Sequence, residues 1–464
     1  MSFAVPSLPL SRSAEIPFAR GLPLVGNLPF ILKDPLGFFL RLSRSAGPVV
    51  RVNLGRSLGE LLLVTDPEVI AHILEGNAAN YRKGRFYGRL RAVFGDNIIL
   101  ADGDDWWRRR RLAAPAFSAR HLEAAGLVMT SSVSGLMERL ERAARQREPV
   151  DLFAAFMELT LGIIVKALFG VDIGARAEAI TAAVEPVLRE GERRVWWPAR
   201  PPLWVPTPTN RKLRAVLAEL DRVVYDLIGE RRRSGEQRED ILDALLAARD
   251  ERGEGLTDRQ LRDEIVGLIV SGHETTATTL AWTLEALSRH TTVESTVRAE
   301  LREVLGPRLP LAADLRHLSY MRAVLQETMR LNPAVWTISR QAVADDVVAG
   351  VPIRAGTVVM MPPHVVHRTA MHWPNPEGFD PDRFREGEPK DADKFTYFPF
   401  GGGPRRCLGA HFSMMEMQIV LASLMQRFRF SLIPGSLPEP AVALTVRPRA
   451  GLWMIPEIVQ PNGA

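Results

Sequence analysis

The chain has 464 residues, and 46% of them are hydrophobic, which is enough to bury a large core. The formal net charge of +5 is too small to predict nucleic-acid binding, and the single cysteine excludes an internal disulfide and a cysteine-rich metal site. No Ser/Gly linker, repeat or low-complexity tract divides the sequence. We therefore expect residues 1–464 to form a single domain.

Residues 1–16 lack a basic start followed by an apolar stretch, and no run approaches the ~20 apolar residues that span a bilayer. We therefore expect no transmembrane anchor and a soluble, cytoplasmic protein. Residues 35–64 predict a helix and then two short strands, at 51–54 and 61–64, and residues 335–361 predict a second set of strands. Distant segments should thus form one small sheet in a helix-rich α+β protein.

A charged segment at 103–111, Gly-Asp-Asp-Trp-Trp-Arg-Arg-Arg-Arg, precedes Pro-Ala-Phe. Trp106 and Arg110 lie one helical turn apart, and Trp107 with Arg111 offers a rival register. The guanidinium fork of arginine suits a carboxylate. A basic surface helix is the alternative explanation for the remaining arginines.

Helical patterns dominate residues 106–331 except at 196–210, where five prolines alternate with apolar residues. This stretch predicts a loop with exposed apolar bulk, and burial of its tryptophans in the core is an equal alternative. The pattern at 263–288 predicts a central, buried helix, in which Glu274 and Thr275 are locally awkward. Such a conflict often marks function. An exposed glutamate and threonines bonded to the helix backbone would also explain it.

Glu327 and Arg330 share a face of a helix that ends before Pro333. An exposed pair at this spacing stabilises a helix by only about 0.2 to 0.5 kcal/mol. The spacing E-x-x-R is so common that it has almost no specificity by itself.

Cys407 lies in the glycine-rich segment 400–409, and apolar residues at helical spacing follow it. This pattern places the thiol at a helix start, where unpaired amide donors favour a thiolate. Arg405 and Arg406 would also lower the thiol pKa, and the glycines let the backbone approach something flat and bulky. The alternatives are inert packing and a nucleophile, and the loop favours a single thiolate ligand.

Phe400, Gly403, Arg405, Cys407 and Gly409 together resemble the haem-binding signature of the cytochrome P-450 monooxygenases, F-x-x-G-x-R-x-C-x-G. The match is complete at the defining positions. The resemblance implies haem b with Cys407 as the proximal thiolate on its iron, Phe400 beside the loop and Arg405 on a haem propionate. A thiolate ligand favours O–O cleavage, whereas histidine suits a globin or peroxidase.

The segment at 271–276, Ser-Gly-His-Glu-Thr-Thr, is similar to the oxygen-activation motif of the same family. The similarity implies that Thr275 hydrogen-bonds dioxygen at the haem and that Glu274 helps deliver protons through water. Gly272 would open room beside the haem. Ser271 departs from the usual alanine or glycine, and its hydroxyl would line the pocket.

Two further resemblances concern the haem propionates. Trp106 and Arg110 resemble the W-x-x-x-R of the helix that covers a propionate, and the Gly-Asp-Asp lead-in and Pro-Ala-Phe exit favour this register. Arg340 resembles a second propionate contact, from a strand near the haem.

A fourth resemblance concerns the fold. Glu327, Arg330 and Arg383 resemble the buried ionic triad of the family, with Asp382 in place of the glutamate of P-E-R-F. Its role would be fold specification and not chemistry.

The resemblance also implies the architecture, a mainly α (α+β) cytochrome P-450 fold. This is a helix-rich triangular prism with small β-sheets and haem between the central helix and the cysteine-ligand helix. Residues 196–210 would be the mobile lid over the substrate channel, and 86–97 the facing variable loop. The sequence after Met425 leaves no room for a flavin or iron–sulfur domain, so we expect no fused reductase.

The implied function is a haem-thiolate monooxygenase of the soluble bacterial type. It would hydroxylate or epoxidise a lipophilic small molecule of secondary metabolism, such as a terpenoid, fatty acid, polyketide or steroid, with O2. Electrons would come from a ferredoxin or flavodoxin with its NAD(P)H-dependent reductase, and we expect a monomer. A peroxide-dependent peroxygenase or a haem-thiolate isomerase would not require Glu274 and Thr275, and a non-catalytic haem sensor would need no reductase.

Overall fold

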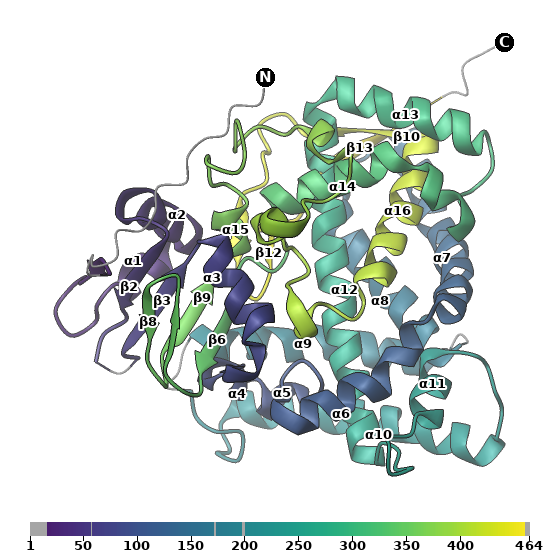
Figure 1. Cartoon of the computed structure of the whole chain (residues 1–464). Coiled ribbons are helices and arrows are strands. Elements are labelled where there is room, and N and C mark those ends of the chain that lie inside the picture. The colour runs from purple at the N-terminus through teal and green to yellow at the C-terminus, as the bar shows by residue number, and fades with distance from the viewer. Residues whose placement is uncertain (1–15, 57, 171–172, 197–199, 460–464) are drawn as a thin grey trace. The chain divides into compact units, whose positions relative to one another are not determined.

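The computed structural model describes residues 16–56, 58–170, 173–196 and 200–459, and Figure 1 traces its helices and strands. The chain divides into two compact units, each made of several segments. Unit 1 comprises Met1–Gly84, Trp336–Pro376 and Glu388–Arg406, and unit 2 comprises Arg85–Val335, Glu377–Gly387 and Cys407–Ala464.

Unit 1 is built around a six-stranded sheet with the order β1-β2-β3-β9-β6-β4. Strands β2 and β3 are antiparallel, β3 runs parallel to β9, and β9 pairs with β6 in antiparallel register. The sheet therefore joins segments far apart in the sequence, which confirms the predicted small sheet. The strands of unit 1 are β1 (Phe18–Ala19), β2 (Val49–Asn53), β3 (Glu60–Val64), β4 (Tyr81–Arg82), β6 (Ile338–Ala342), β7 (Asp346–Val348), β8 (Val351–Ile353) and β9 (Val358–Met361).

The helices of unit 1 are short and follow the sheet strands. Helix α2 begins after Asp34, whose side chain accepts a hydrogen bond from the amide of Gly37 at 2.9 Å. This cap satisfies a donor that would otherwise have no partner at the helix start. The helices are α1 (Leu28–Lys33), α2 (Pro35–Ala46), α3 (Pro67–Ala71) and α15 (Pro363–Val366).

Unit 2 contains most of the helices, and they pack around α12, which extends from Asp258 to Arg289. A reciprocal capping box between Thr257 and Gln260 starts α12. The helices are α4 (Arg85–Gly88), α5 (Arg91–Phe94), α6 (Gly103–Ala113), α7 (Ala119–Gln146), α8 (Leu152–Phe169), α9 (Ala175–Trp196), α10 (Pro208–Ser234), α11 (Ile241–Ala247), α12 (Asp258–Arg289), α13 (Thr291–Leu305), α14 (Ser319–Leu331) and α16 (Ala410–Arg427).

Two small sheets complete unit 2, with the orders β10-β13-β5 and β11-β12. Their strands are β5 (Val150–Asp151), β10 (Phe428–Leu432), β11 (Pro440–Val442), β12 (Val446–Pro448) and β13 (Trp453–Ile458). The prediction of a helix-rich protein with small sheets is confirmed. The predicted central helix at 263–288 is also confirmed, and α12 is longer than the pattern indicated.

Helix α8 packs against α12 and α7. By length and composition it is the one helix in the described part of the chain that could cross a membrane, and 61% of it is buried in the protein. In the sequence, Glu158 and Lys166 interrupt its apolar run. Its burial is typical of a core helix.

The predicted loops differ from the structure in their bounds. Helix α9 extends to Trp196 and α10 starts at Pro208, so the loop is shorter than 196–210. Trp204 is 77% exposed, which supports exposed apolar bulk there, whereas Trp197 lies outside the described residues. The stretch expected as a loop at 86–97 instead contains α4 and α5.

Candidate functional site

Cys407 lies in unit 2, just ahead of helix α16. The side chain is exposed and forms no disulfide, and the helix itself starts at Ala410 with Gly409 as its N-cap. The thiol thus precedes the first helical residue instead of occupying it. It remains beside the first turn of α16, where helix amides have no intrahelical partner.

Arg110 is the group of α6 that acts electrostatically on Cys407. Burial lowers the pKa of Arg110, and the negative charge of the Cys407 thiolate opposes that shift. Within the described residues, Arg110 has no hydrogen bond or ion pair to an acid. Trp106, one turn earlier, is only 4% exposed. The pair therefore presents a half-buried cation near the thiol, with its carboxylate-binding fork available.

The neighbouring arginines are already engaged with acidic residues of unit 2. The pairs are Arg108 with Asp250 at 2.6 Å, Arg109 with Glu264 at 2.9 Å and with Asp105 at 2.7 Å, and Arg111 with Glu251. Trp107 is 48% exposed, in contrast to Trp106. These differences favour the register of Trp106 and Arg110 over its rival. Arg109 is buried, so it is not part of a basic surface.

Helix α12 carries a stripe of more open residues within its buried centre. Leu268, Ser271, Gly272 and Thr275 follow the i, i+3, i+4, i+7 spacing of one helical face, and other protein atoms cover them less than their neighbours. Thr276, beside this stripe, lies 3.0 Å from the Ser413 hydroxyl of α16. The stripe is therefore tied to the helix that follows Cys407.

These observations test whether the residues of unit 2 fit a haem group. A flat, doubly anionic cofactor with a thiolate ligand requires three features. Unit 2 has a thiol beside a helix start, a half-buried cation with no acid partner among the described residues, and an open helix face that contacts α16. The residues therefore fit the group.

The hydroxyls of the open stripe are occupied by the helix backbone. Thr275 Oγ1 donates to the carbonyl of Ser271 at 3.1 Å, and Ser271 Oγ donates to the carbonyl of Gly267 at 2.8 Å. Both bonds are local and are made by rotation about one side-chain torsion. Either hydroxyl can therefore turn to another partner without moving the backbone.

Glu274 does not face the open stripe. Its side chain is buried, and Oε1 accepts hydrogen bonds from Thr445 Oγ1 at 2.7 Å and from Arg447 Nη1 at 3.0 Å. Sequence reasoning missed both partners, because they lie more than 170 residues further along the chain, next to or within β12. The exposed-glutamate alternative is wrong, since Glu274 is only 2% exposed.

Two glycines serve packing in a way that the sequence did not indicate. A Cβ on Gly272 would lie 3.1 Å from a side-chain atom of Ile164 of α8, so this glycine lets the two helices approach. A Cβ on Gly403, where φ is +62°, would lie 1.8 Å from the carbonyl oxygen of Leu74. Only glycine fits that position.

Phe400, Arg405 and Arg340 lie in unit 1. Phe400 lines a cavity of about 140 Å³ together with the glycines of 401–403. Arg340 is 5% exposed within β6 and donates to the carbonyl of Ser339 at 2.9 Å. The predicted cofactor residues are thus divided between the units, and the structure describes each group within its own unit.

The structure brings the three residues of the predicted ionic triad together in unit 2. Arg330 Nε lies 2.7 Å from Glu327 Oε2, and Arg383 Nε lies 3.5 Å from Glu327 Oε1. The side chains of Glu327 and Arg330 have no exposed surface. Asp382, which replaces the family's glutamate, is exposed and pairs with Arg385 at 2.7 Å.

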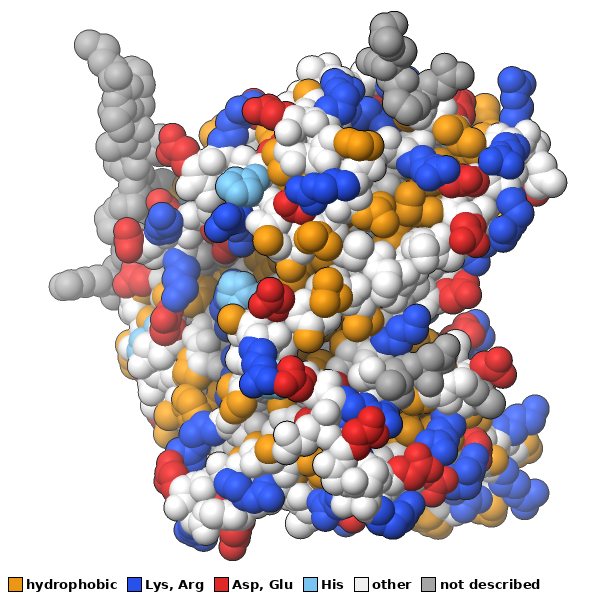
Figure 2. Space-filling model, turned by 90° about the vertical axis from the view of Figure 1, so that its right-hand side faces the viewer, with side chains coloured by type: hydrophobic (Ala, Val, Ile, Leu, Met, Phe, Trp, Pro, Cys, Tyr) orange, Lys and Arg blue, Asp and Glu red, His pale blue; other side chains and the backbone are white. Residues whose placement is uncertain are grey.

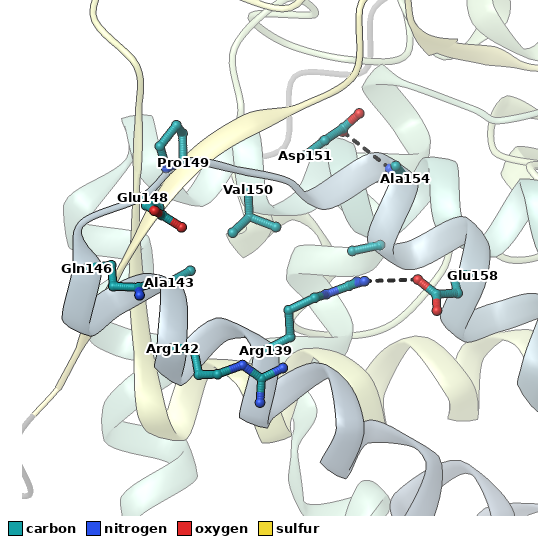
Figure 3. Close-up of a pocket in the computed structure, with 11 residues that line it drawn as sticks. Arg139, Arg142, Ala143, Gln146, Glu148, Pro149, Val150, Asp151, Ala154 and Glu158 are labelled. Carbon is teal, nitrogen blue, oxygen red and sulfur yellow. Dashed lines mark hydrogen bonds and ion pairs between the residues drawn. The ribbon is translucent and has the colours of Figure 1, made fainter.

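A larger cavity of about 430 Å³ lies elsewhere in unit 2, where residues from the end of α7, from β5 and from the start of α8 line it (Figure 3). Arg139 reaches across it to Glu158 at 2.9 Å, and Arg142 lies on its rim. The predicted site residues do not contribute to its lining.

In Figure 2, Lys and Arg side chains are interspersed with Asp and Glu over the visible face, as a small net charge predicts.

Comparison with known proteins gives a family and several relatives. The family model described as Cytochrome P450 matches residues 16–454. The chain is 32% identical to cyclooctatin synthase of Streptomyces melanosporofaciens, over 96% of this chain and 98% of that protein. It is 30% identical to cyclooctat-9-en-7-ol 5-monooxygenase of the same organism, over 93% and 94%. It is 32% identical to LUTEIN DEFICIENT 5 of Arabidopsis thaliana, over 94% of this chain and 76% of that protein.

Proposed function

Because the chain belongs to the cytochrome P450 family, we propose that it binds haem b through the thiolate of Cys407. This is a family of oxidoreductases, and the relatives of this chain include named monooxygenases. The observation that carries the proposal is the exposed thiol next to α16 with the guanidinium of Arg110 acting on it. Haem with a thiolate ligand supplies the activation of O2 by which one oxygen atom enters a substrate. The chain contains no second cysteine that could take this role.

Several arginines and aromatic residues are candidates for holding the cofactor. Arg110, supported by the buried Trp106, is suited to one propionate, and Arg405 and Arg340 are suited to propionates from unit 1. Phe400 would pack beside the loop that carries the thiolate. Arg110 has no acidic partner among the described residues, so its half-buried guanidinium lacks a counter-ion within the protein. A haem propionate would supply that counter-ion, which supports the assignment of Arg110 to a propionate.

Thr275 and Glu274 would move protons. The Thr275 hydroxyl sits on the open stripe of α12 and can leave the Ser271 carbonyl to donate toward the reaction centre. Glu274 follows on the adjacent helical position, is buried, and is held by Thr445 and Arg447. It would hold a proton at its carboxylate and pass it on through water.

The substrate would be a lipophilic small molecule. Cyclooctat-9-en-7-ol, in the name of one relative, and pentalenene, in the name of a Streptomyces avermitilis oxygenase, favour the terpenoid class among those expected from the sequence. The partly exposed Leu268 on the stripe supports contact with an apolar molecule. Hydroxylation or epoxidation would be the outcome.

Electrons would come from a ferredoxin or flavodoxin with its NAD(P)H-dependent reductase. Arg405 and Arg406 directly precede Cys407 in the chain, and an acidic partner would be attracted to them. The family model spans 16–454, which supports a single catalytic domain. Reduction by such a partner should slow as ionic strength rises.

The optical spectrum of the dithionite-reduced protein with carbon monoxide tests the ligand. We expect a strongly red-shifted Soret band, and Cys407→Ser should lose that band while Arg111→Gln keeps it. A histidine-type band from folded, haem-replete wild-type protein would exclude Cys407 as the ligand. Titration of the ferric protein with terpenoids, fatty acids, macrolides and steroids should then give a low-to-high-spin shift with the class that binds.

A further inference from the structure

The guanidinium of Arg447 lies between two carboxylates that belong to different helices. Its Nη1 is 3.0 Å from Oε1 of Glu274 on α12 and 3.3 Å from Oε1 of Glu192 on α9. A second nitrogen, Nη2, is 3.4 Å from Oε2 of Glu192. One cation is therefore shared by two anions, and a single nitrogen faces both of them.

The two carboxylates are not equivalent partners. Glu274 also accepts a hydrogen bond from Thr445 at 2.7 Å, whereas Oε1 of Glu192 is buried and has no hydrogen-bond partner in the described part of the chain. The Arg447 contact to Glu274 is the shorter one. In this arrangement Arg447 binds Glu274 more closely than it binds Glu192.

The charges around the cluster agree with this order. Burial raises the pKa of Glu192, and Arg447 opposes that shift, whereas the charge of Glu274 adds to it. Arg189 and Arg193 of α9 also face Glu192 and favour its ionised form. His273, next to Glu274, is buried, and burial lowers its pKa, so it stays neutral near pH 7.

We propose that Arg447 is a positioning residue that holds the Glu274 carboxylate, and that Glu192 competes for it, so that α9 controls how firmly Glu274 is held. This inference rests on the proposed function, in which Glu274 moves protons. A displacement of α9 that brings Glu192 closer to Arg447 weakens the ion pair between Arg447 and Glu274, because one guanidinium cannot form its shortest hydrogen bonds with both carboxylates. A displacement in the other direction tightens it.

The first experiment follows the carboxylate stretching bands of Glu274 in the haem-loaded, ferric protein by difference infrared spectroscopy, with the bands identified by their loss in Glu274→Gln. Arg447→Gln should shift these bands toward those of a carboxylate without a counter-ion, because the guanidinium is gone. Glu192→Gln should shift them in the opposite direction, because the competitor is gone. Arg447→Lys should restore most of the wild-type position.

Matched controls separate these effects from a general change of charge. Arg449→Gln removes the same charge two residues away, where the side chain pairs with the exposed Glu439 at 3.5 Å. Glu185→Gln removes an exposed carboxylate from the same helix as Glu192. Neither control should shift the carboxylate bands of Glu274. Equal shifts in the controls, or shifts of the same sign in Arg447→Gln and Glu192→Gln, would overturn the proposal.

The second experiment tests the reciprocal effect on α9 by hydrogen exchange. Glu274→Gln releases Arg447 to Glu192, so the amides in the last turns of α9 should exchange more slowly than in wild type. Unchanged exchange in α9 would contradict the competition. Neither measurement requires turnover. A protein without the red-shifted carbon monoxide band would refute the proposed function, and the infrared and hydrogen-exchange measurements would still test whether Arg447 is shared by Glu274 and Glu192.

A kinetic readout then connects the cluster to proton delivery. In Arg447→Gln, kcat should fall about tenfold with KM nearly unchanged, since Arg447 does not line the open stripe, and Arg447→Lys should recover most of the rate. A variant that changes KM alone would show that Arg447 acts on binding instead.

Discussion

Arg330 donates two hydrogen bonds to the carboxylate of Glu327, at 2.7 and 2.8 Å, and neither side chain has any exposed surface. The same guanidinium donates to the carbonyl of Gly378 at 2.9 Å, and the amide of Asp380 donates to Glu327 at 2.8 Å. The pair therefore fastens α14 to the segment that carries Arg383, and each charge is satisfied where water cannot reach it.

Glu327→Gln should destabilise the protein by about 3 to 5 kcal/mol, because it leaves the Arg330 charge buried without an anion. The free energy of unfolding in urea measures the loss. Asp382→Asn is the matched control, since the pair of Asp382 with Arg385 has the same spacing as that of Glu327 with Arg330, but is exposed. It should leave stability nearly unchanged. Equal losses in the two variants would mean that burial does not decide the effect.

Arg110→Gln should weaken retention of haem. One charge-assisted hydrogen bond contributes about 1.5 to 3 kcal/mol. Haem should therefore transfer from the Arg110→Gln variant to excess apomyoglobin at least about tenfold faster than it transfers from the wild-type protein. Arg111→Gln is the control, because Arg111 is exposed and already pairs with Glu251. If Arg111→Gln accelerates transfer and Arg110→Gln does not, the alternative register of Trp107 and Arg111 holds.

The sequence could predict those parts of the fold that depend on local patterns. The period of apolar residues located α12 and α14, and short apolar segments located β2, β3, β6 and β9 of the sheet of unit 1 but not β1 and β4. The spacing of Glu327 and Arg330 was specific only in combination with Arg383, and the structure brings these three together.

Contacts between distant segments could not be predicted. Gly272 looked like a residue that opens space, and only the position of Ile164 on α8 shows that it permits helix packing. The partners of Glu274 belong to a short segment after position 440, where no pattern indicates an ion pair with a helix. Local sequence specifies which groups carry charge, whereas tertiary packing decides which of them meet.

Glu416 is a buried acid that sequence patterns did not single out. It lies on α16 with 1% of its surface exposed, and neither carboxyl oxygen has a hydrogen-bond partner among the residues that the structure describes. Burial raises the pKa of Glu416 well above the usual range, and the nearby Thr276 hydroxyl opposes this shift, although its contacts are to Ser413 and to the Gly272 carbonyl. Burial therefore favours the protonated form of the Glu416 side chain in the folded protein.

This burial predicts a pH dependence of stability. The unfolded chain releases the Glu416 proton above its ordinary pKa of 4.5, whereas the folded protein keeps it. The unfolded state then binds fewer protons, so the free energy of unfolding should fall as pH rises, by up to about 1.4 kcal/mol per pH unit. The contribution is fully present below pH 4.5 and is lost as the pH passes through the raised, folded-state value.

Glu416→Gln should remove this part of the slope, which urea unfolding between pH 5 and about 8 would show as a flatter profile than wild type. Glu178→Gln, an exposed position on α9, is the control and should keep the wild-type slope. Parallel profiles for wild type and Glu416→Gln would mean that Glu416 is ionised in the folded protein.

Thr275→Ala tests the proton path at the open stripe of α12. Without the hydroxyl, protons should reach the reaction centre less effectively, so NADPH use should persist while product falls and hydrogen peroxide rises. The ratio of product to NADPH consumed measures this coupling. Thr283→Ala is the matched control, because the Thr283 hydroxyl donates to the Thr279 carbonyl in a fully buried turn of the same helix. Unchanged coupling in Thr275→Ala would remove Thr275 from the mechanism, and equal uncoupling in both variants would point to a helix defect instead of a lost proton donor.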